Sequence, residues 1–241
     1  MSAPPRNPWH ELPTTAPFVL PCDAAWLPLM QSPSLGEGEK NSARAALNLD
    51  LQPEPFFGPH AAPVVLLLAN PGLGEDDAGH HRRADFVHAL RAHVQSDSGA
   101  PHFHLLDPSH GPGQRWWRRQ CGPLLRASGL SVEALAERLL CIEFFPYHSE
   151  QFAHAHLRLP SQHFSFELLR RAMRRDALVL CMRGYRYWCG AVPELATYAG
   201  LLRPNSPRSA TLSAGNLGAE GFTRVLGALD VRLAPMQERS V

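Results

Sequence analysis

Three short apolar runs divide this chain, and the first of them ends at a sharp break. Residues 64–68 read V-V-L-L-L, residues 139–145 read L-L-C-I-E-F-F, and residues 177–182 read A-L-V-L-C-M. Runs of this length that are apolar on both alternating faces are typical of central strands in a parallel sheet covered by helices. The pattern therefore predicts three buried strands, and residues 198–202 supply a fourth.

Apolar residues at helical spacing lie between and after these runs. The helices predicted from this spacing cover residues 84–94, 114–127, 164–175, 185–191 and 217–229. Asn216 stands where an N-cap residue is expected for the last helix, and Ser131 does so for a short helix before the second strand. The alternation of strands and helices predicts an α/β fold, with three α/β/α layers and a central, mainly parallel, four-stranded sheet.

The remaining segments divide the chain into a domain and two flanking parts. Residues 1–17 are rich in proline and predict extended or disordered chain, and residues 31–41 predict a loop. A short helix is predicted at 24–30, an edge strand at 47–51 and a short strand at 103–106. We therefore expect an N-terminal extension over 1–52, partly disordered or packed on the core, an α/β domain over 53–230, and a tail over 231–241.

The first apolar run ends in Asn70-Pro71-Gly72. Pro71 cannot donate a ladder hydrogen bond and Gly72 permits a sharp turn, so the strand stops abruptly and presents Asn70 at its carboxyl end. Ligands of open α/β sheets bind at that end of the strands. An ordinary strand-to-loop turn is the alternative interpretation.

The same stretch resembles a known family. Residues 68–73, L-A-N-P-G-L, resemble the G-I-N-P-G-L motif of the mismatch-specific uracil/thymine-DNA glycosylases, a branch of the uracil-DNA glycosylase superfamily. Residues 206–210, S-P-R-S-A, resemble the S-P-x-S-A part of the second superfamily motif, and the two motifs stand in the family's order. The usual His-Pro or Asn-Pro before that second motif is inverted here to Pro204-Asn205.

The resemblance implies roles for individual residues. Asn70 would position the hydrolytic water at the strand end, with Pro71 and Gly72 completing the catalytic motif. The other implied substrate-binding residues are Leu73, Phe86, Glu143, Phe144 and His148. The implied DNA-binding loop, which would wedge into the minor groove and hold phosphates, consists of Asn205, Ser206, Pro207, Arg208 and Ser209.

Glu143 departs from the family, which has an Asn near this place to read the Watson–Crick edge of the flipped base. A carboxylate offers only acceptors, whereas an amide offers an acceptor and donors. We therefore expect Glu143 to accept hydrogen bonds from a base that presents N–H groups. A structural ion pair with Arg183, at the end of another strand, is the alternative that the sequence leaves open.

Composition limits the ways in which this chain could meet nucleic acid. The 241 residues carry a formal net charge of +1, so any DNA binding must come from local patches. The helix over 114–127 interleaves Arg with Trp116 and Trp117, which could track a nucleic-acid backbone. A core helix with an Arg-rich outer face is the interpretation that we favour.

The five cysteines are scattered, which predicts reduced thiols, a cytoplasmic location and no iron–sulfur cluster. Glu75, Asp76 and Asp77 precede His80 and His81 and suggest a metal site. Acids are also common at helix N-termini, so we expect no metal and no cofactor. The histidines of the later loop are expected mainly on the surface, with His148 at the mouth of the site; they are His148, His154, His156 and His163.

Taken together, the residues and the resemblance predict a monomeric, monofunctional DNA glycosylase with DNA as its partner and no membrane association. The main alternative is a catalytically inactive nucleic-acid-binding or interaction module of the same fold. A nucleotide or phosphate-ester enzyme is a further alternative. The chain lacks G-x-G-x-x-G, a P-loop and G-x-S-x-G, which argues against dinucleotide binding, P-loop chemistry and a serine nucleophile elbow.

Overall fold

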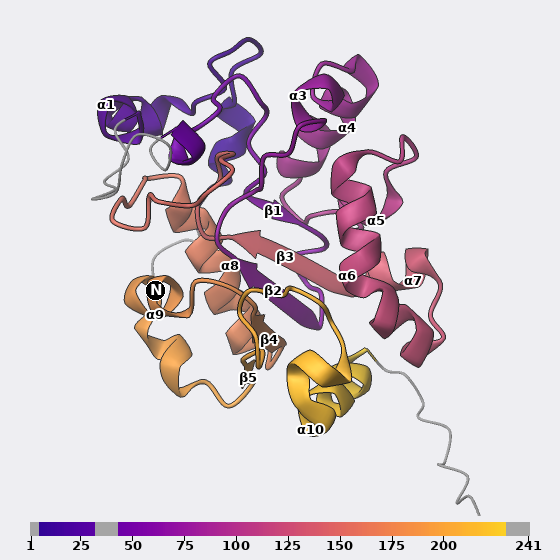
Figure 1. Ribbon diagram of the computed structural model, residues 1–241. Helices are drawn as coiled ribbons and strands as arrows, with labels where there is room; N and C mark the ends of the chain where they lie inside the picture. Colours follow the sequence, from indigo (N-terminus) through magenta and orange to yellow (C-terminus); the bar gives the residue numbers. More distant parts are fainter. Residues whose placement is uncertain (1–4, 32–42, 230–241) are drawn as a thin grey trace, which may run out of the picture.

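The computed structural model describes residues 5–31 and 43–229, and its centre is a five-stranded mixed sheet (Figure 1). The strand order is β1-β3-β2-β4-β5. The strands are β1 (Phe56–Phe57), β2 (Val64–Leu68), β3 (Leu139–Glu143), β4 (Leu178–Cys181) and β5 (Leu201–Leu202). Strands β2, β3, β4 and β5 run parallel to one another, and β1 pairs antiparallel with β3 at one edge of the sheet.

Helices of very different length surround the sheet. The α-helices are α1 (Leu27–Met30), α3 (Asp77–His80), α4 (Ala84–Val94), α5 (Phe103–Leu106), α6 (Pro112–Ser128), α7 (Val132–Ala136), α8 (Gln162–Arg174), α9 (Tyr185–Ala191) and α10 (Ala214–Ala228). Three 3-10 helices span Pro8–Glu11, Pro21–Trp26 and Pro193–Thr197. The predicted α/β class is confirmed, as are helices close to the predicted positions of α4, α6, α8, α9 and α10.

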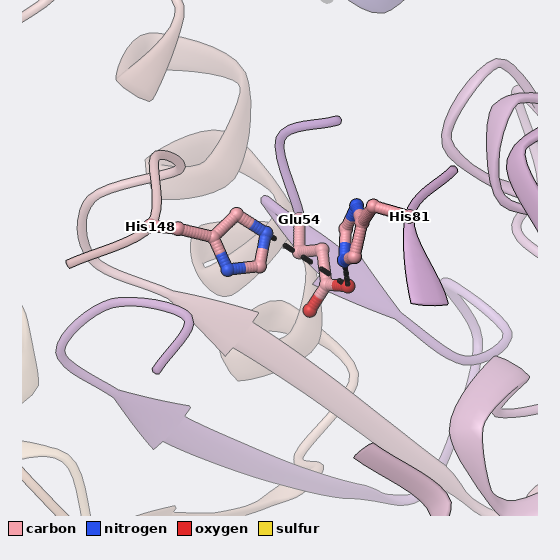
Figure 2. Close-up of side chains that lie close together, drawn as sticks. All are labelled: Glu54, His81 and His148. Atoms are coloured by element: carbon pink, nitrogen blue, oxygen red, sulfur yellow. Dashed lines mark ion pairs between the residues drawn. The ribbon is translucent and has the colours of Figure 1, made fainter. Parts of the chain in front are cut away.

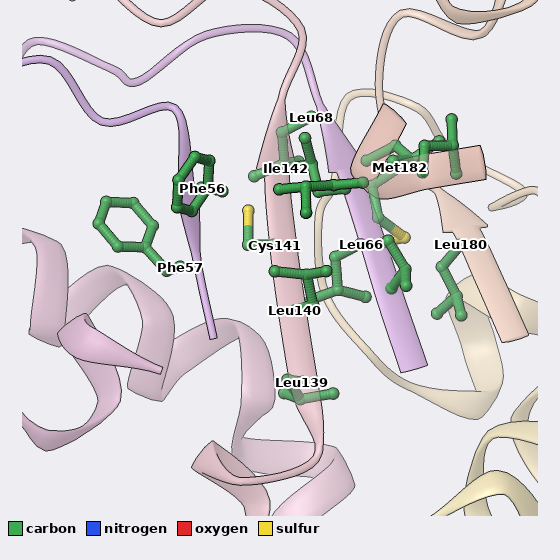
Figure 3. Close-up of a cluster of buried hydrophobic side chains, with 14 of the residues drawn as sticks. Phe56, Phe57, Leu66, Leu68, Leu139, Leu140, Cys141, Ile142, Leu180 and Met182 are labelled. Atoms are coloured by element: carbon green, nitrogen blue, oxygen red, sulfur yellow. The ribbon is translucent and has the colours of Figure 1, made fainter. Parts of the chain in front are cut away.

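The core is built where the sequence is continuously apolar. Every residue of β2, β3 and β4 is buried, and β2 lies between the other two strands (Figure 3). Phe56 and Phe57 of β1 belong to the same hydrophobic core and lie beside β3 at the edge of the sheet. The long apolar runs thus mark strands that are covered on both faces, as expected for the centre of a parallel sheet.

The expected count of four strands is wrong because it omits β1. Phe56 pairs with Ile142 and Phe57 with Cys141, so this strand is only two residues long. So short a strand has no readable period, and its proline-rich approach gives the pattern of a loop. The sheet is consequently mixed rather than wholly parallel.

Two strands that the sequence predicts, at residues 103–106 and 47–51, do not form. Residues 103–106 form helix α5, and their four residues are too few for the pattern to separate helix from strand. Residues 47–51 make only one isolated bridge, between Asn48 and His148. This bridge nevertheless ties the N-terminal part to the loop after β3.

The described part of the N-terminal segment packs on the core. Trp9 is completely buried in a short 3-10 helix, and the Asn7 side chain caps this helix and donates to Val94 O at 2.9 Å. The prediction of extended or disordered chain is therefore wrong for Pro8–Glu11, because proline at a first helical position favours a helix start. Residues 1–4, most of the predicted loop at 31–41, and the tail at 231–241 lie outside the described residues.

Gly58 fixes the turn after β1, and we expect Gly58→Ala to destabilise the protein by about 3 kcal/mol or more. Its φ is +115°, and a Cβ atom there would lie 1.9 Å from Leu139 O. Gly227→Ala in α10 is the matched control, since that site is open and helical and alanine favours helices. Chemical unfolding measures both, and equal midpoints for the two variants would contradict the role of Gly58.

Candidate functional site

A cavity of about 530 Å³ opens at the carboxyl ends of β2, β3 and β4. Its size is in the range of small-molecule pockets, which span roughly 300–1,000 Å³. Of the residues that the sequence selects, it is lined by Asn70, Pro71, Gly72, Leu73, Phe86, Glu143 and His148. Strand β2 pairs with β3 so that Leu68 lies opposite Glu143, and this register brings two of the predicted segments to one cavity.

Asn70 is held in one orientation by the loop that follows β3. Its Nδ2 donates to Pro71 O at 2.8 Å, to Ser149 Oγ at 3.0 Å and to Ser149 O at 3.3 Å. The two carbonyl oxygens only accept hydrogen bonds, so they fix which end of the amide carries the nitrogen. Oδ1 is thereby left as the acceptor that Asn70 can offer to a ligand.

Glu143 lines the same cavity, and its side chain is buried. Burial, followed by the charge of Glu54, raises the pKa of Glu143 well above its usual value of 4.5, although the charge of Arg183 acts in the opposite direction. Among the described residues, Oε2 has no hydrogen-bond partner, and Glu143 forms no ion pair with Arg183. A raised pKa favours the protonated carboxyl group, which offers one donor and one acceptor, and the acceptor-only carboxylate stays a prediction.

A second buried acid, Glu54, is surrounded by histidines. The Nε2 atom of His104 lies 3.1 Å from Oε2, and those of His81 and His148 lie 3.5 and 3.9 Å from Oε1. Burial opposes ionisation of Glu54, but the charges of His104 and His148 outweigh it and hold the pKa well below 4.5. The pKa values of the two acids in the cavity are thus shifted in opposite directions by their different environments.

His148 is buried and lines the cavity beside Glu54. Its Nδ1 lies 2.8 Å from Gly72 O and its Nε2 lies 3.0 Å from Gln52 O. Burial lowers the pKa of His148, against the charge of Glu54. His154 is buried as well, so the prediction of a surface histidine is wrong for this residue.

The oxygen and ring nitrogens of Glu54, His81 and His148 lie within 4.8 Å of one another, which is a spacing that could hold a metal ion (Figure 2). The acids considered from the sequence lie elsewhere: Asp76 pairs with Arg115 at 3.0 Å, and Asp77 accepts from Gly74 N. Sequence reasoning missed Glu54 and His104, and the only local signal was a carboxylate set between two prolines.

Aromatic side chains form one wall of the cavity. Phe57, Phe86, Trp116 and Trp117 line it, and Phe86 packs edge-on against the ring of His81 at 5.0 Å. Trp117 is buried and Trp116 half-buried, so the predicted inner side of α6 faces the cavity. A flat planar ligand would find apolar faces here and polar groups at the strand ends.

Phe144 lies outside this cavity. It is completely buried and packs against Phe166 at 5.6 Å and Trp188 at 5.3 Å. Neighbouring residues of an extended chain point to opposite faces, so Glu143 at the cavity places Phe144 in the core behind it. Its predicted contact with substrate is therefore corrected to a packing role.

The predicted DNA-binding loop follows β5 and does not line the cavity. Four of its residues, 205–208, are exposed, and Ser209 is half-buried. Asn216 holds the loop: Oδ1 accepts from Ser206 N at 3.0 Å and Nδ2 donates to Ser209 O at 3.0 Å. The N-cap of α10 is Ser213 rather than Asn216, whose side chain is used for the loop.

Comparison of the chain with protein-family models, curated proteins and solved structures finds no match. None of the helices that the structure describes combines the length and the apolar character needed to cross a membrane.

Proposed function

We propose that this protein binds DNA and hydrolyses the N-glycosidic bond of a flipped deaminated or mismatched base. One observation carries the proposal: Asn70 and Glu143 come from adjacent parallel strands and line one cavity of ligand size. The proposal includes a monomer in the cytoplasm and helices layered on both faces of the sheet.

Hydrolysis requires a placed water and stabilisation of the departing base. Asn70 Oδ1 would hold the water through one hydrogen bond, because the amide nitrogen is engaged by Pro71 and Ser149. The water oxygen bonds to the anomeric carbon, the bond from that carbon to the base nitrogen breaks with its electron pair, and the proton of the water passes to the medium or the base. Groups that stabilise the charge arising on the base lower the barrier.

Glu143 is the group best placed to read the base. In its protonated form, which the raised pKa favours, the carboxyl group would present an O–H donor and a carbonyl acceptor side by side, which is the pattern of an amide. Such a pair complements a base edge with an adjacent carbonyl and N–H, as in uracil, hypoxanthine or xanthine. Phe86 and Trp116 supply apolar surface for the ring.

The exposed loop after β5 would hold the DNA backbone. Arg208 is exposed within it, as is Ser206 with its hydroxyl group. Guanidinium and amide donors of this kind contact phosphates and position the strand without reading sequence. With a net charge of +1, such local contacts would have to provide the attraction.

The test is incubation with oligonucleotides that contain uracil, hypoxanthine, xanthine or a G·T mismatch, followed by alkaline cleavage of abasic sites. We expect strand breaks at one or more of these bases and at no ordinary base pair. Binding of the same oligonucleotides without cleavage would favour the inactive binding module. Absence of both binding and cleavage would overturn the proposal.

A further inference from the structure

Glu54, His81 and His148 direct one carboxylate oxygen and two ring nitrogens at a common point. In Figure 2 the two imidazole rings flank the carboxylate, each directed at the same oxygen. That oxygen, Oε1, lies 3.5 Å from His81 Nε2 and 3.9 Å from His148 Nε2. Both distances exceed the 2.7–3.2 Å that an N–H···O hydrogen bond takes. All three side chains are buried and line the cavity.

Both ring nitrogens of His148 face oxygen atoms. Its two ring nitrogens face Gly72 O and Gln52 O, and both of those atoms are acceptors only. A neutral imidazole has a single N–H, so one nitrogen would point its lone pair at an oxygen. Because Nδ1 has the shorter contact and takes the proton, Nε2 is left facing Gln52 O and Glu54 Oε1. A second proton on His148, or a metal cation bound to Nε2, would remove the repulsion between the Nε2 lone pair and these oxygen atoms.

The spacing of the ligand atoms favours the metal cation. Zinc binds nitrogen and oxygen ligands at about 2.0–2.2 Å, which places the ligand atoms of a tetrahedral site roughly 3.4 Å apart. The separations of 3.5 and 3.9 Å are close to that value, and the whole set lies within 4.8 Å. A direct ion pair between Glu54 and a protonated His148 would draw the two atoms closer than they are.

Neighbouring groups hold the side chains of Glu54, His81 and His148 in place, as outer-shell contacts do for metal ligands. His148 Nδ1 lies 2.8 Å from Gly72 O, and donation of its N–H to this backbone carbonyl would leave the lone pair of Nε2 for an ion. His104 engages the far oxygen of Glu54 at 3.1 Å and leaves Oε1 for the ion. His81 is held by ring packing on Phe86 and His148, each at 5.0 Å.

We propose that Glu54 Oε1, His81 Nε2 and His148 Nε2 bind one divalent transition-metal ion of the zinc class. Imidazole nitrogens with one carboxylate select such ions over calcium or magnesium, which prefer oxygen ligands. All three residues line the cavity, so a fourth position is open to water or to a ligand oxygen. The site stands independently of the glycosylase proposal, since it concerns binding alone.

The test is metal binding by the chelator-treated, full-length chain in the absence of DNA. Equilibrium dialysis with zinc, read by elemental analysis, is expected to give one ion per chain. Cobalt(II) substitution is expected to give visible absorption typical of four- or five-coordination. Glu54→Gln and His81→Asn should abolish this ion, and His104→Gln should weaken binding roughly 10–100-fold.

His154→Asn is the matched control, because it removes another buried histidine that contacts Met30 O outside the cluster. It should retain one ion, and circular dichroism should show that each variant is folded. If the wild-type chain binds no zinc or cobalt, the proposal is overturned and the second charge on His148 is a proton. Unchanged binding in both Glu54→Gln and His81→Asn would overturn it as well, since the ion would then lie elsewhere.

Discussion

Asn70→Ala is expected to lower the rate of base release by roughly 10²–10³-fold, the loss that follows removal of one positioned hydrogen-bonding group at a reacting centre. The amide is locked by Pro71 O and by Ser149, so its free Oδ1 is held in place before any ligand arrives. Alanine removes the acceptor and leaves the backbone turn as it is. Single-turnover cleavage of the best oligonucleotide measures the effect.

Ser149→Ala supplies the graded comparison. It removes one of the contacts to Asn70 Nδ2 but leaves the two carbonyl acceptors and Oδ1. We expect a smaller loss of rate than with Asn70→Ala, and affinity for DNA close to wild type in both variants. An Asn70→Ala protein that is folded, binds DNA and retains full rate would show that the water is held by another group.

The sequence predicts the centre of this fold well because its signal is strongest there. Residues 64–68 are apolar at every position, and only burial on both faces of a sheet accommodates such a run. The break at Pro71 then places Asn70 at the carboxyl end of β2. The order of the parallel strands brings Glu143 to the same edge, so the predicted pair meets in one cavity.

The rest of the site depends on contacts that no local pattern encodes. Glu54 precedes a two-residue strand that only its pairing with β3 defines. His104 lies on a four-residue helix, and His81 follows another. Glu54, His81 and His104 come together through the packing of these short elements, and their spacing along the chain does not predict it. The raised pKa of Glu143 is also invisible in the sequence, since it follows from burial and from the charge of Glu54, which only the fold brings close.

Glu143→Gln is expected to retain base cleavage, whereas Glu143→Ala is expected to lose it by roughly 10²-fold or more. Glutamine keeps an acceptor and a donor at the end of β3 and so reproduces what the neutral acid offers. Alanine removes both, and a base edge left without partners in a buried site is strongly disfavoured. Cleavage rates on matched oligonucleotides separate the two variants. A glutamine variant with shifted base preference would instead indicate that Glu143 acts as a carboxylate.

The pH dependence of folding stability also reports whether Glu143 keeps its proton, and this measurement needs no substrate. The pKa of Glu143 is raised in the folded state by burial and by Glu54, with Arg183 opposing, so above pH 4.5 the unfolded chain releases a proton that the folded chain keeps. Wild-type stability should therefore fall, relative to Glu143→Gln, as the pH rises from 4.5 toward neutrality. Urea unfolding of both proteins at pH 4.5 and pH 7.5 measures this difference. A constant difference between the two would mean that Glu143 is already ionised in its cavity, and the acid would then have to be balanced by a cation held close to Glu54.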